Sequence, residues 1–357
     1  MVADGTAYAQ NMHVLSRMHR FGSSLNVTKD LRLRQTPLIL RRLRVVPCRA
    51  TAQPISARPL GTDSERVKDS VEYNFACPIC LTTEFSIQKS NQGLAQALHC
   101  DRCARTFSAN EKSVDLTSTS GAPARVYKQS FWGGTQIFRS PLVSFAYERG
   151  WRSSFTWAGF PGEQKEFEMA MDYLQAAYGE VLVDMSCGSG LFSRRFVRSG
   201  KFAGVIAADF SESMLTQAKQ FFDEDRSLDT RQYVLLRADV GRLPFPTGSV
   251  AAIHAGAAIH CWPNPTMAVA EISRVLRPGG VFVGSTFLKA SAPLGQLLNN
   301  DDLVRPLNSL DPMSGGSNYQ WWEEAELREL TAAMGLQDFQ RHRTNRFIMF
   351  AVQKPRI

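Results

Sequence analysis

Short apolar runs alternate with amphipathic segments along the second half of the chain. The apolar runs predict strands over residues 181–185, 204–208, 234–236, 250–258 and 281–287. Helical periodicity between them predicts helices over residues 191–198, 211–222 and 266–276. Strands that alternate with helices are typical of an α/β fold. We therefore predict a Rossmann-like, doubly wound sheet over residues 176–357.

Two other segments carry different patterns. Residues 121–175 are rich in Phe, Tyr and Trp and are interrupted by Pro and Gly, which predicts a helical N-terminal subdomain. Most of its aromatic side chains are expected in the core, and some are expected to line an apolar pocket. Residues 288–320 are polar and rich in Asn, Asp, Gly and Pro, which predicts a flexible cap over a substrate site.

The basic charge of the chain is concentrated at its N-terminal end. The formal net charge is +8, and residues 1–60 hold ten Lys and Arg against two Asp, so the remainder is formally neutral. Between Leu31 and Thr62 there is no acidic residue. Arg-rich, acid-poor composition is typical of organelle transit peptides. We predict a disordered transit peptide over residues 1–60, and the alternative is a basic tail that binds nucleic acid.

Four of the seven cysteines form two CxxC pairs within residues 65–120. The pairs are Cys77 with Cys80 and Cys100 with Cys103, and their separation matches tetrathiolate zinc sites. We predict a small zinc ribbon with structural Zn²⁺. Disulfides and a thioredoxin-like redox role fit less well, because no secretory signal is present and neither pair precedes a βαβ pattern. Residues 61–120 carry six basic and eight acidic side chains, which disfavours RNA binding by the ribbon.

The first predicted strand of the sheet runs into a turn of small residues, Ser186 to Gly190, and then into a helix. This arrangement forms the ligand-binding corner of a doubly wound sheet. Asp209 ends the next strand, where a carboxylate accepts the hydroxyls of a ribose. A dinucleotide is the rival ligand, but its third glycine position holds Ser193. A compact ligand that joins a nucleoside to an amino acid fits better.

This layout resembles the class I S-adenosylmethionine-dependent methyltransferases, whose last strand is antiparallel. The stretch Asp184-Met-Ser-Cys-Gly-Ser-Gly190 is similar to their D-x-G-x-G-x-G motif, with Ser186 at the first glycine. The stretches that begin at Asp209 and Arg274 are similar to D-x-S-x-x-M-L and R-x-L-K-P-G-G. The resemblance implies that S-adenosylmethionine is the cofactor.

On that resemblance, each matched position has an expected role. Gly188 and Gly190 face the methionyl part, Asp209 binds the ribose, and Asp239 accepts from the adenine amino group. Phe210 and Met214 flank the adenine. The full set of expected cofactor-binding residues is Asp184, Ser186, Cys187, Gly188, Gly190, Asp209, Phe210, Ser211, Met214, Ala238, Asp239, Val240, His254, Ala255 and Gly256.

More narrowly, the chain resembles plant chloroplast methyltransferases of unassigned substrate. The stretches from Phe138 to Trp151 and from His254 to Pro263 carry this resemblance, together with the basic arm and the cysteine ribbon. It implies an enzyme of the chloroplast, with the mitochondrion as the alternative. The ribbon also resembles one that precedes a bacterial ribosomal-RNA guanine methyltransferase.

Methyl transfer from a sulfonium needs alignment more than a fixed catalytic motif. His254 and His260 are candidate bases, and a core role is equally compatible with each. Tyr147 and Trp262 are weaker candidates for holding an acceptor, and Cys261 is expected to be a buried thiol.

Three hypotheses for the function follow. The first is methylation of a small acceptor, aromatic or prenylated, in the plastid. The second is methylation of organellar ribosomal RNA, which the neutral body of the chain disfavours. The third is a non-catalytic, cofactor-binding protein of plastid lipid bodies. No run of the chain reaches the roughly 18 apolar residues of a membrane span, so any membrane association is expected to be peripheral.

Overall fold

The computed structural model describes residues 71–89, 96–109, 113–120, 155–156, 158–310 and 319–356. The predicted transit peptide and the stretch from Phe138 to Trp151, which includes Tyr147, lie outside these residues. So do residues 121–154 of the predicted helical subdomain over residues 121–175.

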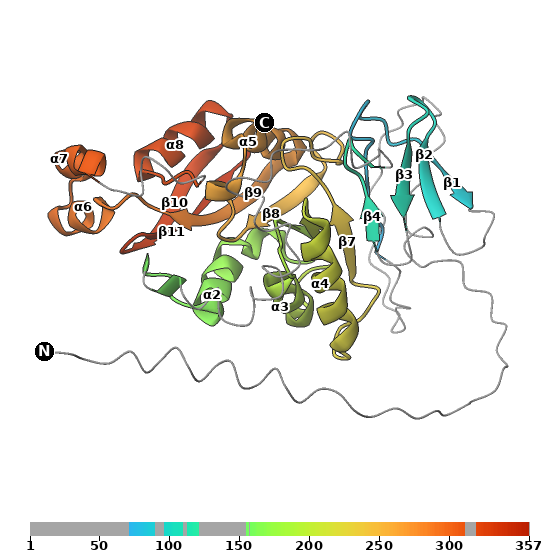
Figure 1. The fold of residues 1–357 in the computed structure, drawn as a ribbon, viewed down its shortest axis with the longest axis horizontal. Helices are drawn as coiled ribbons and strands as arrows, with labels where there is room; N and C mark the ends of the chain where they lie inside the picture. Colours follow the sequence, from blue (N-terminus) through green and yellow to red (C-terminus); the bar gives the residue numbers. More distant parts are fainter. Residues whose placement is uncertain are drawn as a thin grey trace, which may run out of the picture. The chain divides into compact units, whose positions relative to one another are not determined.

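The described strands form one mixed sheet in the order β1-β2-β3-β4-β7-β6-β5-β8-β9-β11-β10 (Figure 1). Neighbours from β4 to β9 pair in parallel, whereas β9, β11 and β10 pair antiparallel. The strands are β5 (Val181–Met185), β6 (Gly204–Asp209), β7 (Tyr233–Arg237), β8 (Val250–Ala255), β9 (Leu276–Phe287), β10 (Gln337–Thr344) and β11 (Phe347–Gln353). This order, with the antiparallel end, confirms the predicted class I methyltransferase fold.

Helices cover both faces of the sheet, and each face has its own apolar core (Figure 1). The helices α2 (Glu163–Tyr173), α3 (Leu191–Ser199) and α4 (Glu212–Glu224) cover one face. The helices α5 (Pro265–Val275) and α8 (Glu324–Ala333) cover the other. The shorter elements are η6 (Gln175–Ala177), η7 (Ile259–Cys261), α6 (Ala292–Leu298), α7 (Asp301–Val304) and η8 (Arg305–Leu310).

Local sequence explains where the helices next to the sheet begin and end. The hydroxyl of Ser211 accepts from the backbone N–H of Met214 and caps α4, and Asn264 caps α5 ahead of Pro265. Gly200 ends α3 at a φ of 61°, a conformation that glycine adopts without steric cost. These ends fix the loops at the carboxyl edge of the parallel strands.

Two predicted strand boundaries are wrong. The strand predicted over 250–258 ends at Ala255, because the chain turns at Ala257 with a φ of 51°. The strand predicted from Val281 begins at Leu276. Its register against β8 shifts between Val250 and Ala252, so the Pro278-Gly279-Gly280 stretch lies at an irregularity inside the strand.

The cysteine-rich segment extends the sheet at its β7 edge. Its strands are β1 (Phe85–Lys89), β2 (Gln96–Cys100), β3 (Thr106–Ala109) and β4 (Ser113–Asp115). The first three form an antiparallel meander, and β4 pairs in parallel with β7. Phe75, Phe107 and Leu116 share one buried core with Leu236 and Phe245 of the main sheet. The ribbon is therefore packed as a continuation of the sheet, and the predicted domain boundaries stay a prediction.

The predicted cap has regular structure where the structure describes it. The helices α6 and α7 and the helix η8 occupy residues 292–310, and residues 311–318 lie outside the described part. Arg343 on β10 pairs with Asp301 on α7 at 2.6 Å, which ties this lobe to the sheet. Within the described residues, no helix combines the length and the apolar character that crossing a bilayer requires.

Candidate functional site

Asp209 holds the turn between β5 and α3 against the end of β6. Its two carboxylate oxygens accept backbone N–H groups of Gly188 and Ser211, each at 2.8 Å. Burial raises the pKa of Asp209 above its usual value, and the two backbone donors oppose that rise. An ionised carboxylate offers about four lone-pair positions, so positions remain for ligand hydroxyl groups. Asp209 thus fits the ribose of S-adenosylmethionine.

The glycines of the turn make room that a side chain would fill. Gly190 has a φ of 80°, and a Cβ atom there would lie 2.7 Å from the ring of Phe222 on α4. Gly188 also lies in the left-handed region, at a φ of 57°. Gly190 therefore lets the turn pack closely on α4, and the predicted contact of the two glycines with the methionyl part stays a prediction.

Ser186 occupies the first position of the turn in a conformation that glycine usually takes. Its φ is 60°, and its Oγ accepts from Nε1 of Trp262 at 3.0 Å. The next residue, Cys187, has a thiol whose pKa burial raises well above the usual value, with the charge of Asp209 adding to the rise. Cys187 therefore contributes a neutral side chain to this corner.

The carboxylate of Asp184 is buried in the protein and is hydrogen-bonded to two side chains. The hydroxyl of Ser193 donates to one oxygen, and the other lies 2.7 Å from Nδ1 of His254 on β8. The imidazole packs against Phe192 and Phe196 of α3, with ring centroids 5.4 and 5.0 Å away. Nε2 of His254 is buried and has no hydrogen-bond partner among the described residues. This geometry gives His254 a fixed orientation under α3.

Close packing against His254 explains why position 256 is a glycine. A Cβ atom at Gly256 would lie 2.9 Å from Cε1 of His254. Ala255, between them, is buried at the end of β8. His254, Ala255 and Gly256, all predicted to bind the cofactor, therefore pack closely together at the end of β8.

His260 belongs to an aromatic cluster centred on Phe287. The His260 and Phe287 rings meet edge to face at 4.8 Å, and Phe155, Phe160 and Trp321 also contact Phe287. Nδ1 of His260 lies 3.1 Å from Oγ1 of Thr286, and burial lowers the pKa of His260 to about 3. The imidazole is therefore neutral at physiological pH.

The aromatic cluster reaches back to the cofactor corner. Tyr319 lies 5.8 Å from the His260 ring, and burial raises the pKa of Tyr319 to about 12. The thiol of Cys261 interacts electrostatically with Tyr319 and with Asp209, and burial raises its pKa to about 12. The thiol of Cys261 is therefore neutral. Its side chain is only partly buried, so the prediction of a buried thiol is met in part.

The loop after β7 carries the residues predicted at the adenine. Ala238 and Val240 are buried, and Oδ1 of Asp239 accepts from the backbone N–H of Gly241 at 2.9 Å. Phe210 follows β6, and its carbonyl accepts from Nε of Arg237 at 3.2 Å. The guanidinium of Arg237 lies 5.7 Å from the Phe210 ring centroid. Met214 is buried in the first turn of α4.

The predicted cofactor residues therefore gather at the carboxyl ends of β5, β6, β7 and β8, where open α/β sheets bind ligands. A hollow of about 210 Å³ beside Tyr173, Asp338 and Ala351 lies elsewhere, against Val281 inside β9. It is separate from this corner.

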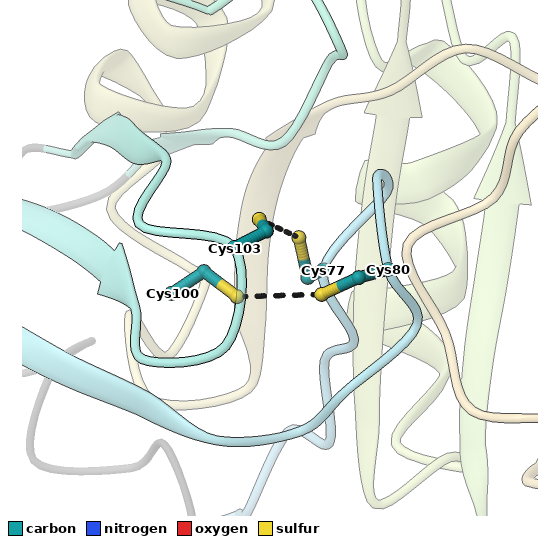
Figure 2. A group of neighbouring side chains, drawn as sticks. All are labelled: Cys77, Cys80, Cys100 and Cys103. Carbon is teal, nitrogen blue, oxygen red and sulfur yellow. Dashed lines mark hydrogen bonds between the residues drawn. The ribbon is translucent and has the colours of Figure 1, made fainter.

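The four cysteines converge as the spacing predicts (Figure 2). All four Sγ atoms lie within 4.8 Å of one another, with Cys77 to Cys103 at 3.6 Å and Cys80 to Cys100 at 3.5 Å. A tetrahedral zinc site with Zn–S bonds of about 2.3 Å has sulfur–sulfur distances of about 3.8 Å. The donor set therefore fits a zinc ion.

The two CxxC turns repeat one backbone pattern. In the first, the N–H of Leu81 donates to the carbonyl of Cys77 at 2.8 Å; in the second, that of Ala104 donates to Cys100 at 2.9 Å. Leu81 and Ala104 both have positive φ, at 60° and 56°. The matching turns present both sulfur pairs inward, which is the geometry of a four-thiolate metal site.

Comparison with known proteins agrees with this geometry. Residues 183–284 match the family model for a methyltransferase domain. An uncharacterized chloroplastic methyltransferase of Arabidopsis thaliana is 46% identical over 288 residues, which cover 79% of this chain and 78% of the relative. A second one from the same plant is 45% identical over 286 residues, covering 78% of each. This chain belongs to their family of S-adenosylmethionine-dependent methyltransferases.

A more distant relative is a demethylmenaquinone methyltransferase of Desulfitobacterium hafniense. It is 25% identical over 189 residues, which cover 52% of this chain and 64% of the relative. For this methyltransferase, the sequence pattern located the cysteine cluster, and the residues that it predicts at the cofactor lie at one edge of the sheet. It missed Ser193, Arg237, Arg242 and the bond from Trp262 to Ser186, because these contacts join segments distant in the chain and no local motif marks them.

Proposed function

We propose that this methyltransferase transfers a methyl group from S-adenosylmethionine to a small acceptor, aromatic or prenylated, in the chloroplast. The observation that carries the proposal is the neutral aromatic cluster around Phe287, in which the His260 ring contacts both Phe287 and Tyr319. Trp262, two residues after His260, donates to Ser186 at 3.0 Å, which supports a position of this cluster beside the cofactor corner. Apolar, uncharged walls favour a neutral, flat or lipid-like acceptor.

The residues at the carboxyl edge of the sheet have separate roles in the proposed reaction. When bound, S-adenosylmethionine supplies a methyl group on a sulfonium sulfur. Asp209 would hold the ribose, Asp239 the adenine amino group, and the turn from Ser186 to Gly190 the methionyl part. His260 is neutral and so is able to accept a hydrogen bond from an acceptor hydroxyl, but its pKa of about 3 makes it a weak base. The aromatic side chains exclude water and orient the acceptor.

The relatives support the substrate class and the compartment. Demethylmenaquinone, which the Desulfitobacterium hafniense relative is named for, is a prenylated quinone. The two plant relatives are named as chloroplastic, and this chain has an arm over residues 1–60 of the composition that transit peptides have. The four cysteines would hold a structural zinc ion that stabilises the ribbon.

Calorimetric titration with S-adenosylhomocysteine tests the cofactor site. Asp209→Ala is expected to weaken binding at least about tenfold, because two ribose hydroxyls lose a charged acceptor. Asp223→Ala on the exposed side of α4 is the matched control and is expected to bind like the wild type. Equal affinity in all three proteins would refute the assignment of Asp209.

Product formation with defined acceptors tests the substrate class. Prenylated quinones, simple phenols and ribosomal RNA are offered to the zinc-loaded enzyme with labelled S-adenosylmethionine. Label in a quinone or phenol supports the proposal. Label in RNA alone would overturn it in favour of the ribosomal-RNA hypothesis, and cofactor binding without transfer to any acceptor would favour the non-catalytic one.

A further inference from the structure

The first cysteine turn is hydrogen-bonded directly to the loop that carries Asp239. Arg242 donates from Nε to the carbonyl of Pro78 and from Nη2 to that of Ile79, the latter at 2.7 Å. Both acceptors lie between Cys77 and Cys80. The backbone N–H of Ala76 also donates to the carbonyl of Pro244 at 2.9 Å. The loop and the cysteine turn are thus joined by three hydrogen bonds.

Arg242 is also part of the turn that shapes Asp239. Its backbone N–H donates to the carbonyl of Asp239 at 2.9 Å, and the carboxylate of Asp239 accepts from Gly241 at 2.9 Å. The side chain of Arg242 therefore contacts the cysteine turn while its backbone holds the aspartate. Arg242 is therefore a direct link between the cysteine turn and Asp239.

A second connection joins the ribbon to Phe210, the other residue predicted to lie beside the adenine. Asp115 at the end of β4 pairs with Arg237 at 3.1 Å. Arg237 in turn donates to the carbonyl of Phe210 and covers its ring. Asp115 is held in place by Thr117, whose hydroxyl donates to its carboxylate at 2.7 Å. The ribbon therefore contacts both residues predicted to face the adenine, Asp239 through Arg242 and Phe210 through Arg237.

The far side of the loop is fixed independently of the ribbon. Glu271 on α5 accepts from the backbone N–H of Leu243 at 2.8 Å, and Arg274 donates to the carbonyl of Leu243 at 2.9 Å. Losing the contacts of Arg242 would therefore loosen the segment around Asp239 while Leu243 stays anchored. We therefore expect the contacts of Arg242 to affect the position of the loop around Asp239 more than the stability of the fold.

We propose that the metal-bound cysteine cluster positions the adenine subsite through Arg242 and Arg237, so that metal occupancy and cofactor affinity are linked. The inference rests on the proposed cofactor site. A bound metal fixes the carbonyls of Pro78 and Ile79, because both lie inside the loop that Cys77 and Cys80 close. Without the metal, these carbonyls are free to move and Arg242 loses its fixed acceptors. Arg242 and Arg237 are positioning residues, since they act through Asp239 and Phe210.

Thermodynamic linkage makes the proposal measurable in two directions. If the metal tightens cofactor binding, then the cofactor tightens metal binding by the same factor. Metal removal from the full chain is expected to weaken the affinity for S-adenosylhomocysteine about fivefold or more. Saturating S-adenosylhomocysteine is expected to slow metal release to a chromogenic chelator. The second readout reports a link that a purely structural ribbon would lack.

Variants of Arg242 distinguish a loss of coupling between metal and cofactor binding from unfolding of the protein. Arg242→Met keeps the length of the side chain and removes both donors, and Arg242→Lys retains one charged donor. We expect metal to remain bound in both, with affinity for S-adenosylhomocysteine lowest in Arg242→Met and intermediate in Arg242→Lys. In Arg242→Met, the ligand is expected to lose its effect on metal release. Arg226→Met, at an exposed arginine after α4, is the matched control.

The possible outcomes distinguish this inference from the proposed function. Equal affinities in the wild type, Arg242→Met and Arg226→Met, with metal release that ignores the ligand, overturn the inference alone. A wild-type, metal-loaded chain that binds no S-adenosylhomocysteine overturns both. If Arg242→Met loses its metal, Asp115→Asn provides the second variant, because it weakens the contact with Arg237 at a distance from the cysteines. Wild-type affinity in Asp115→Asn would then overturn the inference.

Discussion

The indole Nε1 of Trp262 donates a hydrogen bond of 3.0 Å to Oγ of Ser186, across the gap between the loop after β8 and the turn after β5. Ser186 has a φ of 60° at the position where the family motif has glycine. A left-handed backbone costs a residue with a Cβ roughly 1–2 kcal/mol. The bond from Trp262, whose side chain is buried, offsets part of that cost and holds the turn in a shape suited to the cofactor.

Replacing the indole tests this compensation. Trp262→Phe removes the donor and keeps an aromatic ring, so Ser186 retains its strain without its partner. We expect S-adenosylhomocysteine affinity to fall about fivefold, equivalent to about 1 kcal/mol for one neutral hydrogen bond. The double variant Ser186→Gly, Trp262→Phe is expected to recover most of the affinity in calorimetry. Failure of glycine to rescue the turn would show that Trp262 acts in another way.

Asp184 is expected to stabilise the fold more than it binds a ligand. Asp184→Ala leaves the hydroxyl of Ser193 and Nδ1 of His254 buried without their acceptor, at an expected cost of about 3 kcal/mol in the free energy of unfolding. Asp172→Ala, on the exposed side of α2, is the control and is expected to change stability by less than about 0.5 kcal/mol. Urea denaturation measures both. A cost below about 1 kcal/mol for Asp184→Ala would contradict the buried network.

Alanine substitutions at two glycines distinguish the cost of a left-handed backbone from the cost of a steric clash. Gly190 and Gly179 have φ values of 80° and 83°, but only at Gly190 would a Cβ atom collide with a neighbour, the ring of Phe222. Gly179→Ala is expected to cost about 1 kcal/mol from the left-handed conformation alone. Gly190→Ala is expected to cost about 1–3 kcal/mol more and to lose cofactor binding. Equal unfolding midpoints in urea would rule out the close packing at Gly190.

The depressed pKa of His260 predicts a dependence of stability on pH. Burial lowers this pKa from 6.5 to about 3, so between these values the unfolded chain binds a proton that the folded chain does not. Stability therefore falls as pH drops below about 6.5. His260→Gln removes this contribution. Between pH 7.5 and 5.5, the wild type is expected to lose about 1.4 kcal/mol more than the variant.

Urea unfolding at the two pH values provides this comparison. His342→Gln, at an exposed histidine on β10, is the matched control and is expected to lose stability as the wild type does. If His260→Gln and the wild type lose the same stability, His260 is protonated in the folded protein at pH 5.5.

The parallel core was predictable because its signals are local. Each of the strands β5, β6 and β7 is an apolar run, and Ser211 and Gly200 mark helix ends by their own chemistry. The cysteine cluster was predictable for the same reason, since each CxxC pair forms its turn within a few residues. The end of β8 was not, because the run continues as Ala-Gly-Ala-Ala-Ile and nothing in that composition marks the positive φ of Ala257.

The contacts that shape the candidate site could not be predicted. His254 faces Asp184 because β5 and β8 are neighbours in the sheet, although 70 residues separate them in the chain. Arg242 reaches Pro78 across 164 residues. Such contacts depend on strand order and on side-chain direction, and neither is encoded in one stretch of sequence. The predicted role of His254 as a base stays a prediction.

The pairing of β4 with β7 has a consequence for shortened forms of the chain. In a chain that begins after residue 120, β7 would become an edge strand, with its backbone N–H and C=O groups and its apolar Val234 and Leu236 newly exposed. An uncovered apolar edge recruits strands from other molecules. Such a truncated protein is therefore expected to aggregate, even though it retains every residue of the cofactor corner. The ribbon therefore protects the edge of β7 from pairing with strands of other molecules.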